Sequence, residues 1–115
     1  MRTIIAGSRE GAHMCHLEKA VAECGWEISL VLSGCARGAD SLGEEWARRN
    51  KIPVERYPAD WDRHGKVAGI IRNGEMCENA EALIALWDGQ SHGTQHCIKR
   101  ARELGLRVHI QPLTP

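Results

Sequence analysis

One stretch of the sequence, ISLVLSGCARGAD at residues 28–40, joins an apolar run to a glycine-containing loop and then to an amphipathic segment. The run at 28–32 has the length and composition of a strand that is covered on both faces. The apolar and small side chains that follow share one helical stripe, namely Ala39, Leu42, Gly43 and Trp46. A strand, a glycine loop and a helix in this order indicate the repeating unit of a parallel α/β sheet.

The same unit recurs on both sides of this stretch. Similar apolar runs lie at residues 3–6, 54–57, 82–87 and 107–110. Three more amphipathic stripes separate them, with Met14, Leu17, Val21 and Cys24 in the first, Val67, Ile70 and Ile71 in the third, and Cys97, Ile98, Ala101 and Leu104 in the fourth. Gly105 stands where a helix commonly ends in a left-handed residue. The pattern predicts a Rossmann-like three-layer α/β/α sandwich with a mainly parallel five-stranded sheet.

Length and composition indicate one globular domain over residues 1–115, with a tail at 111–115 that we expect to fray. Apolar residues make up 43% and charged residues 26%, close to the averages of globular domains. The apolar run near Met1 is too short for a signal peptide, and no run is long enough to cross a membrane. We therefore expect a cytoplasmic protein with no membrane partner.

Charge and cysteine content narrow the function classes. Fifteen basic and fifteen acidic side chains give a formal charge of zero, whereas proteins that hold a nucleic-acid backbone usually carry a basic stripe. Extended nucleic acid is therefore a disfavoured partner, while a small phosphorylated ligand needs only local positive potential. The five cysteines have no C-x-x-C spacing, which indicates buried free thiols.

The loops after the first two predicted strands carry candidate ligand-binding residues. In a doubly wound sheet these loops lie at one edge, near the reversal of strand order, where ligands bind. The first loop has Gly7, Ser8 and Arg9, which suit a tight turn and a phosphate contact, or else form a plain turn with a solvated arginine. The second has Ser33, Gly34, Gly38, Ala39 and Asp40, where a helix start favours an anion. Asp40 either accepts from a ribose hydroxyl or caps the helix, and Glu44 is open to the same two interpretations.

A third loop and a polar segment add further candidates. The loop after residues 82–87 contains Asp88, Gly89, Ser91, Gly93 and Thr94, which form either a second anion-binding nest or a capped turn without a ligand. In the polar segment, Trp61 could stack on a base, Lys66 and Arg72 could neutralise phosphate, and Asn73 could bind a base or sugar edge. The alternative is that Trp61 covers the core and the cations are solvated. No loop has the G-x-G-x-x-G or G-K-[ST] pattern, so ordinary nicotinamide or triphosphate chemistry is not indicated.

The sequence does not favour a metal site, a tightly bound cofactor or a nucleophile. Some of the six histidines lie near cysteines in the sequence, in the two groups His13, Cys15, His16 and His92, His96, Cys97. Neither group has a defined set of partner ligands for a metal. No serine or cysteine lies in a recognisable activating motif. We expect the ligand to be a nucleotide or a nucleotide derivative and no other cofactor to be bound.

Taken together, these motifs resemble the SLOG superfamily, which includes the LOG proteins and the Rossmann domain of DNA-processing protein A. The resemblance to the small YspA-type group rests on Gly7-Ser8-Arg9, Ser33-Gly34-x-x-x-Gly38-Ala39-Asp40, Pro58-Ala59-Asp60-Trp61, Gly65-Lys66, Ala68-Gly69, Arg72-Asn73, Met76 and Trp87-Asp88-Gly89-x-Ser91-x-Gly93-Thr94. It implies a nucleotide-binding domain, often a homo-oligomer. LOG enzymes cleave the N-glycosidic bond of nucleoside monophosphates with a P-G-G-x-G-T-x-x-E motif.

Only part of that LOG motif is present. Gly93-Thr94 matches its Gly-Thr, but the preceding Pro-Gly-Gly is absent and Cys97 occupies the glutamate position, with Glu75 as a candidate substitute. We therefore favour a sensor or sequestering module for a nucleotide-derived ligand. The alternatives are a phosphoribohydrolase-type enzyme and, against the neutral charge, a DNA-handling protein.

Overall fold

The structure, a computed structural model, describes residues 1–113 and contains one five-stranded sheet. Its strands are β1 (Arg2–Gly7), β2 (Leu30–Ser33), β3 (Val54–Arg56), β4 (Ala82–Trp87) and β5 (Arg107–Pro112). Its helices are α1 (Met14–Glu23), α2 (Ala39–Arg49), α3 (Trp61–His64), the 3₁₀ turn η1 (Gly65–Val67), α4 (Ala68–Asn79) and α5 (His92–Glu103). The strand order is β3-β2-β1-β4-β5 and every pair is parallel, which confirms the predicted fold class.

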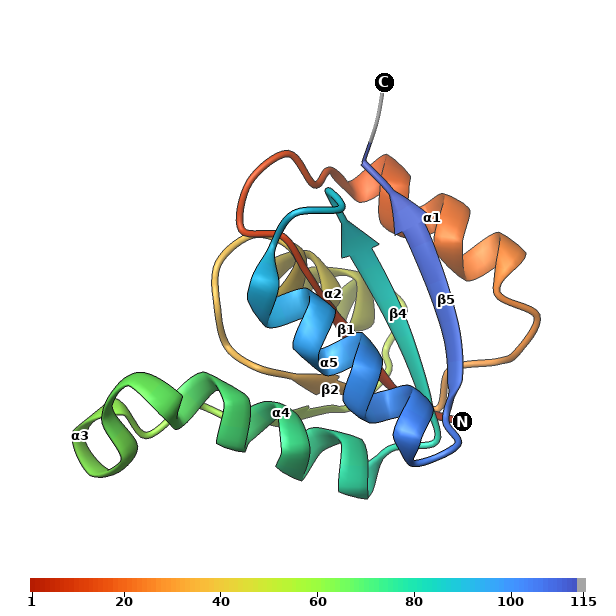
Figure 1. The fold of residues 1–115 in the computed structure, drawn as a ribbon. Helices are drawn as coiled ribbons and strands as arrows, with labels where there is room; N and C mark the ends of the chain where they lie inside the picture. Colours follow the sequence, from red (N-terminus) through yellow and green to blue (C-terminus); the bar gives the residue numbers. More distant parts are fainter. Residues whose placement is uncertain (114–115) are drawn as a thin grey trace.

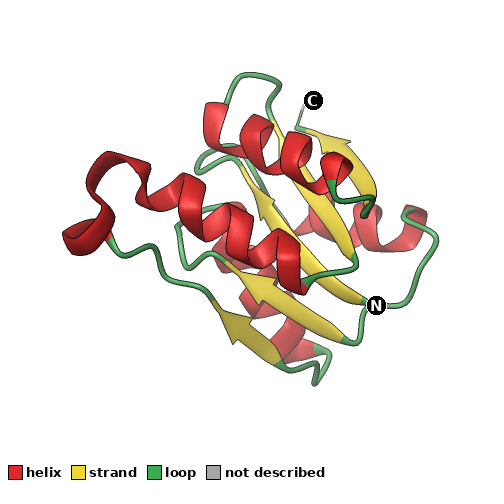
Figure 2. Ribbon diagram, turned by 60° about the horizontal axis from the view of Figure 1, so that its bottom comes forward, coloured by secondary structure: helices red, strands yellow, loops and turns green. Residues whose placement is uncertain are grey.

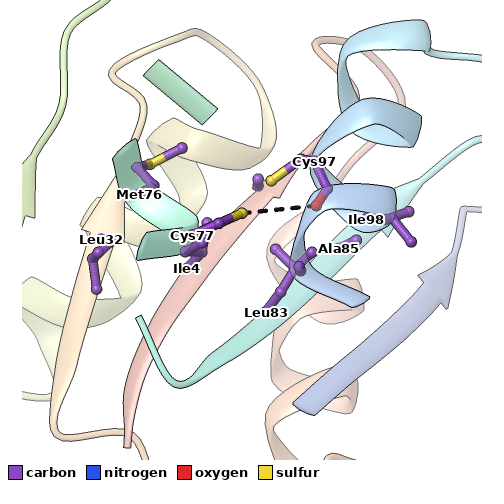
Figure 3. Packing of buried hydrophobic residues seen from close by; sticks show 10 residues of the cluster. Ile4, Leu32, Met76, Cys77, Leu83, Ala85, Cys97 and Ile98 are labelled. Carbon is purple, nitrogen blue, oxygen red and sulfur yellow. Dashed lines mark hydrogen bonds between the residues drawn. The ribbon is translucent and has the colours of Figure 1, made fainter. Parts of the chain in front are cut away.

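Helices cover both faces of the sheet (Figures 1 and 2). On one face α1 and α2 bury Leu17, Ala20 and Ala47 against Ile5 and neighbouring strand residues. On the other face α4 and α5 pack on the sheet in a second cluster, shown in Figure 3, where the Cys77 Sγ lies 3.8 Å from the Cys97 carbonyl oxygen. The central strands β1, β2 and β4 are mostly apolar because both of their faces are covered, whereas the edge strands β3 and β5 also carry exposed charged residues.

The predicted fraying of the tail is wrong for Gln111 and Pro112. Strand β5 continues through both residues, in register with Leu86 and Trp87 of β4, and Gln111 is buried. The Leu113 N–H donates to the Trp87 carbonyl and extends this pairing. Sheet pairing therefore orders polar residues that have little strand character of their own. The rest of the predicted tail, at 114–115, lies outside the described residues.

The predicted apolar stripe of α4 is also wrong. Val67 and Ile70 are about half exposed, and the buried face of the helix instead carries Ala68, Met76 and Cys77. The reason is tertiary, because α3, η1 and the start of α4 project from the sheet (Figure 1). Helix α4 joins the core cluster on the sheet through Met76 and Cys77 in its second half, whereas Ala68 is buried outside that cluster. Similarly Leu104, predicted to continue the stripe of α5, is exposed at the end of that helix.

All five cysteines are free, but only three of them are buried. Cys24, Cys77 and Cys97 lie in the two cores, as predicted. Cys15 is exposed because it lies on the solvent side of α1, and Cys35 is half-buried in the loop after β2. Among residues 1–113 no three His, Cys, Asp or Glu side chains are grouped as metal ligands would be.

Candidate functional site

The strand order reverses between β1 and β4, and a cleft of about 450 Å³ opens beside the carboxyl ends of these two strands. This point is where open α/β sheets hold their ligands. The cleft is lined by residues of β1, of the loops after β1, β2 and β4, and of α2, α4 and α5. Its lining residues are Ala6, Gly7, Ser8, Arg9, Glu10, Ala36, Asp40, Arg72, Asn73, Met76, Asp88, Ser91, Gly93, Thr94 and Cys97.

Ser8, in the loop after β1, forms hydrogen bonds with the end of β4, the loop after it and the start of α2. Its N–H donates to the Leu86 carbonyl at 2.9 Å, its hydroxyl oxygen accepts the Asp88 N–H at 3.1 Å, and its carbonyl accepts the Ala39 N–H at 3.1 Å. The chain can turn this tightly because Gly7 has no side chain, since a Cβ there would lie 2.0 Å from the Leu86 carbonyl oxygen. Ser8 therefore positions the cleft as well as lining it.

The loop after β2 uses its own hydrogen-bonding groups inside the protein. Ser33 is fully buried, donates from its hydroxyl to Glu44 at 2.6 Å and accepts the Cys35 N–H. The structure thus places Glu44 as a partner of Ser33, outside the cleft. Of the residues predicted in this loop as ligand contacts, Asp40 lines the cleft, whereas Ser33, Gly34, Gly38 and Ala39 do not.

Gly38 has a structural role instead. Its φ of +78° lies in the left-handed region, and a Cβ would lie 2.5 Å from the carbonyl oxygens of both Ser8 and Arg9. Such a position accepts only glycine. The close approach brings the start of α2 against the loop after β1, where the Ser8 carbonyl takes the Ala39 N–H.

Asp40 is a carboxyl group only 6% exposed at the floor of the cleft. Its Oδ2 accepts a hydrogen bond from the Ala36 N–H at 3.1 Å. Asp40 is not the N-cap of α2, because Gly38 occupies that position. Burial raises the pKa of Asp40 to about 6, because removal from water disfavours the ionised form more than the Ala36 N–H and the charge of Arg72 favour it. The cleft therefore contains a carboxyl that changes charge close to neutral pH.

Arg72 is held in place by its neighbours on two sides. Its Nε donates to the Asn73 Oδ1 at 3.0 Å and its Nη1 donates to the Gly34 carbonyl. Asn73 in turn donates from its Nδ2 to the Gly93 carbonyl at 3.2 Å, which links α4 to α5. The guanidinium is thus fixed at the cleft wall, while Arg9, in the loop after β1, is exposed.

The start of α5 contributes backbone amides. Ser91 is the N-cap residue but its side chain makes no capping bond, so the first-turn N–H groups at Gly93 and Thr94 have no side-chain partner. Asp88 accepts the N–H groups of Gln90 and Ser91 on its Oδ1, and these bonds lower the pKa of Asp88. A helix start of this kind favours an anion.

A second cavity of about 450 Å³ adjoins the cleft. Three residues line both, namely Arg9, Ala36 and Arg72. The second cavity also contains Gly34, Cys35, Arg37, Pro58, Ala59 and Trp61. Trp61 is 53% exposed and does not cover the core. Lys66 and Gly89, two other predicted ligand contacts, line neither cavity.

Sequence reasoning missed several lining residues. Glu10 and Ala36 belong to loops that the sequence marked, and their proximity to the flagged residues could have included them. Met76 and Cys97 lie one turn beyond Asn73 and Thr94 on their helices, and a helical wheel would have found them. Glu75, the candidate substitute for the missing LOG glutamate, is exposed and lines neither cavity.

The fold and cleft define a doubly wound, Rossmann-like α/β protein with its candidate site at the switch point. The chain belongs to the YspA, cpYpsA-related SLOG family, whose sequence model matches residues 1–64, and this confirms the resemblance seen in the motifs. The Gene 61 protein of Mycobacterium phage D29 is 41% identical to it over 85 residues, which cover 69% of this chain and 68% of that protein.

A solved structure shares the fold. The DNA processing protein A (DprA) from Streptococcus pneumoniae superposes with a TM-score of 0.67 at 18% sequence identity. The match covers 96% of this chain and 50% of that one, so the chain spans half the length of this structural relative. Within residues 1–113 no helix has the length and apolar character needed to cross a membrane.

Proposed function

We propose that the chain binds a nucleotide or nucleotide-derived ligand in the switch-point cleft, as a sensor or sequestering module. The observation that carries the proposal is the joint presence of the fixed Arg72 guanidinium and the uncapped start of α5 on one cleft. Arginine and a helix N-terminus both suit phosphate, and they act here from two separate elements.

The carboxylates of the cleft support a nucleotide over a bare phosphate ion. Asp40, Asp88 and Glu10 share the cleft with Arg9 and Arg72. Carboxylate oxygens accept hydrogen bonds from hydroxyl groups but repel an isolated anion. A ligand that combines a phosphate with the hydroxyls of a ribose therefore matches this mixture of charges better than inorganic phosphate does.

Isothermal titration tests the proposal. We expect heat of binding from nucleoside mono- and diphosphates, and much weaker or no heat from the corresponding nucleosides. Arg72→Gln should lower nucleotide affinity at least tenfold, because hydrogen bonds to charged groups contribute about 1.5–3 kcal/mol. Arg63→Gln is the matched control, since Arg63 is exposed on α3 and lines neither cavity. Equal affinity for nucleosides and nucleotides would refute the proposal.

A further inference from the structure

The cleft and the second cavity share a wall that carries two arginines. Arg9 and Arg72 line both spaces, each of which has about 450 Å³. A cavity of about 300–1,000 Å³ is enough for a whole small-molecule ligand. The chain thus offers two adjoining spaces, with guanidinium groups at their junction.

The two spaces differ in chemistry. The cleft contains the carboxyl groups of Glu10, Asp40 and Asp88. Within the described chain, the second cavity has no carboxylate in its lining and instead combines three arginines with Trp61. Carboxylates accept hydrogen bonds from sugar hydroxyls, whereas an indole stacks on planar heterocycles. One end therefore suits a sugar and the other suits a base.

Trp61 and Arg72 lie over the same bare position of α4. A Cβ built on Gly69 would lie 3.5 Å from the Trp61 Cη2 and 3.6 Å from the Arg72 Nη2. Both side chains therefore lie within contact distance of the same helix position. Arg72 uses the N–H of Nε on Asn73 and one N–H of Nη1 on Gly34, which leaves both N–H groups of Nη2 to bind a ligand, close to the indole.

We propose that the two cavities form one two-part site for a nucleoside diphosphate that carries a second sugar. The heterocycle stacks on Trp61, the diphosphate lies at the junction beside Arg9 and Arg72, and the hydroxyls of the second sugar donate to Asp40 and Asp88. This inference rests on the proposed function and names the class of ligand for the same site.

The test compares the affinities of AMP, ADP, ADP-ribose and UDP-glucose by isothermal titration. We expect ADP-ribose or UDP-glucose to bind at least tenfold more tightly than AMP, with ADP between them. Trp61→Ala should lower the affinity for the tighter of the two about tenfold, because a stacked base contributes about 1–3 kcal/mol. Trp61→Phe should restore most of it, since a phenyl ring also stacks.

Val67→Ala is the control on the same projecting segment, because Val67 is half exposed and lines neither cavity. If AMP binds as tightly as the sugar-linked diphosphates, or if Trp61→Ala leaves their affinity unchanged, the two-part site is refuted while the proposed function stands. If none of the four compounds binds, the proposed function fails and this inference fails with it.

Discussion

The free energy of unfolding of Asp40→Asn, compared with that of the wild type, should increase as the pH rises from acid to neutral. The Asp40 pKa rises from 3.8 to about 6 on folding because the carboxyl is buried in the cleft floor. Well below pH 3.8 the group is neutral in both the folded and the unfolded chain. As the pH rises from about 4 to about 6, the unfolded chain releases the proton first, so the free energy of unfolding falls. Well above pH 6 the free energy of unfolding has fallen by the full amount that the two pKa values allow.

The difference between the two pKa values corresponds to about 3 kcal/mol. Asparagine is neutral throughout, and its side-chain oxygen can still accept the Ala36 N–H that Asp40 accepts. The free energy of unfolding of the variant therefore does not fall as the pH rises to neutral. Because part of this difference is already present at pH 4, we expect the free energy of unfolding of Asp40→Asn, minus that of the wild type, to increase by about 2.4 kcal/mol between pH 4 and pH 7.5.

Urea unfolding followed by tryptophan fluorescence at several pH values measures this difference. A constant offset, caused for example by the new amide NH₂ group, cancels because only the change with pH is compared. Asp62→Asn is the matched control, since it makes the same chemical substitution at an exposed position. Parallel curves for the wild type and Asp40→Asn would refute the reasoning, because they would mean that Asp40 titrates alike in both states.

Three further predictions concern two glycines, the cysteine thiols and the cleavage of AMP. Gly38→Ala should destabilise the fold by about 2 kcal/mol or more in urea unfolding, because of its positive φ and the carbonyl oxygens 2.5 Å from the new Cβ, whereas Gly93→Ala, with no atom within 4 Å, should be neutral or mildly stabilising. If Gly93→Ala destabilised the fold as much as Gly38→Ala, this reasoning would be contradicted. Ellman's reagent should titrate Cys15 rapidly and Cys35 more slowly, with all five thiols reacting only after denaturation. Incubation with AMP should release no free adenine by chromatography, since Cys97 stands in place of the LOG glutamate. Turnover would favour the enzyme alternative.

The sequence predicted the elements whose signals are local. The apolar run at 82–87 matches β4 residue for residue, and Gly105 has the positive φ expected after α5. It also placed the three loops at one edge, because parallel strands joined by helices must end on the same side. The cleft accordingly contains Arg9, Asp40 and Thr94.

Only the tertiary structure decided which groups of those loops remain open to a ligand. The Ser8 hydroxyl meets the Asp88 N–H across 80 residues of sequence, and Arg72 meets the Gly34 carbonyl across 38. The buried face of α4 likewise depends on where that helix reaches the core, so Val67 is exposed. Periodicity and glycine positions act over a few residues, whereas hydrogen bonds and burial depend on partners that the fold brings from far away.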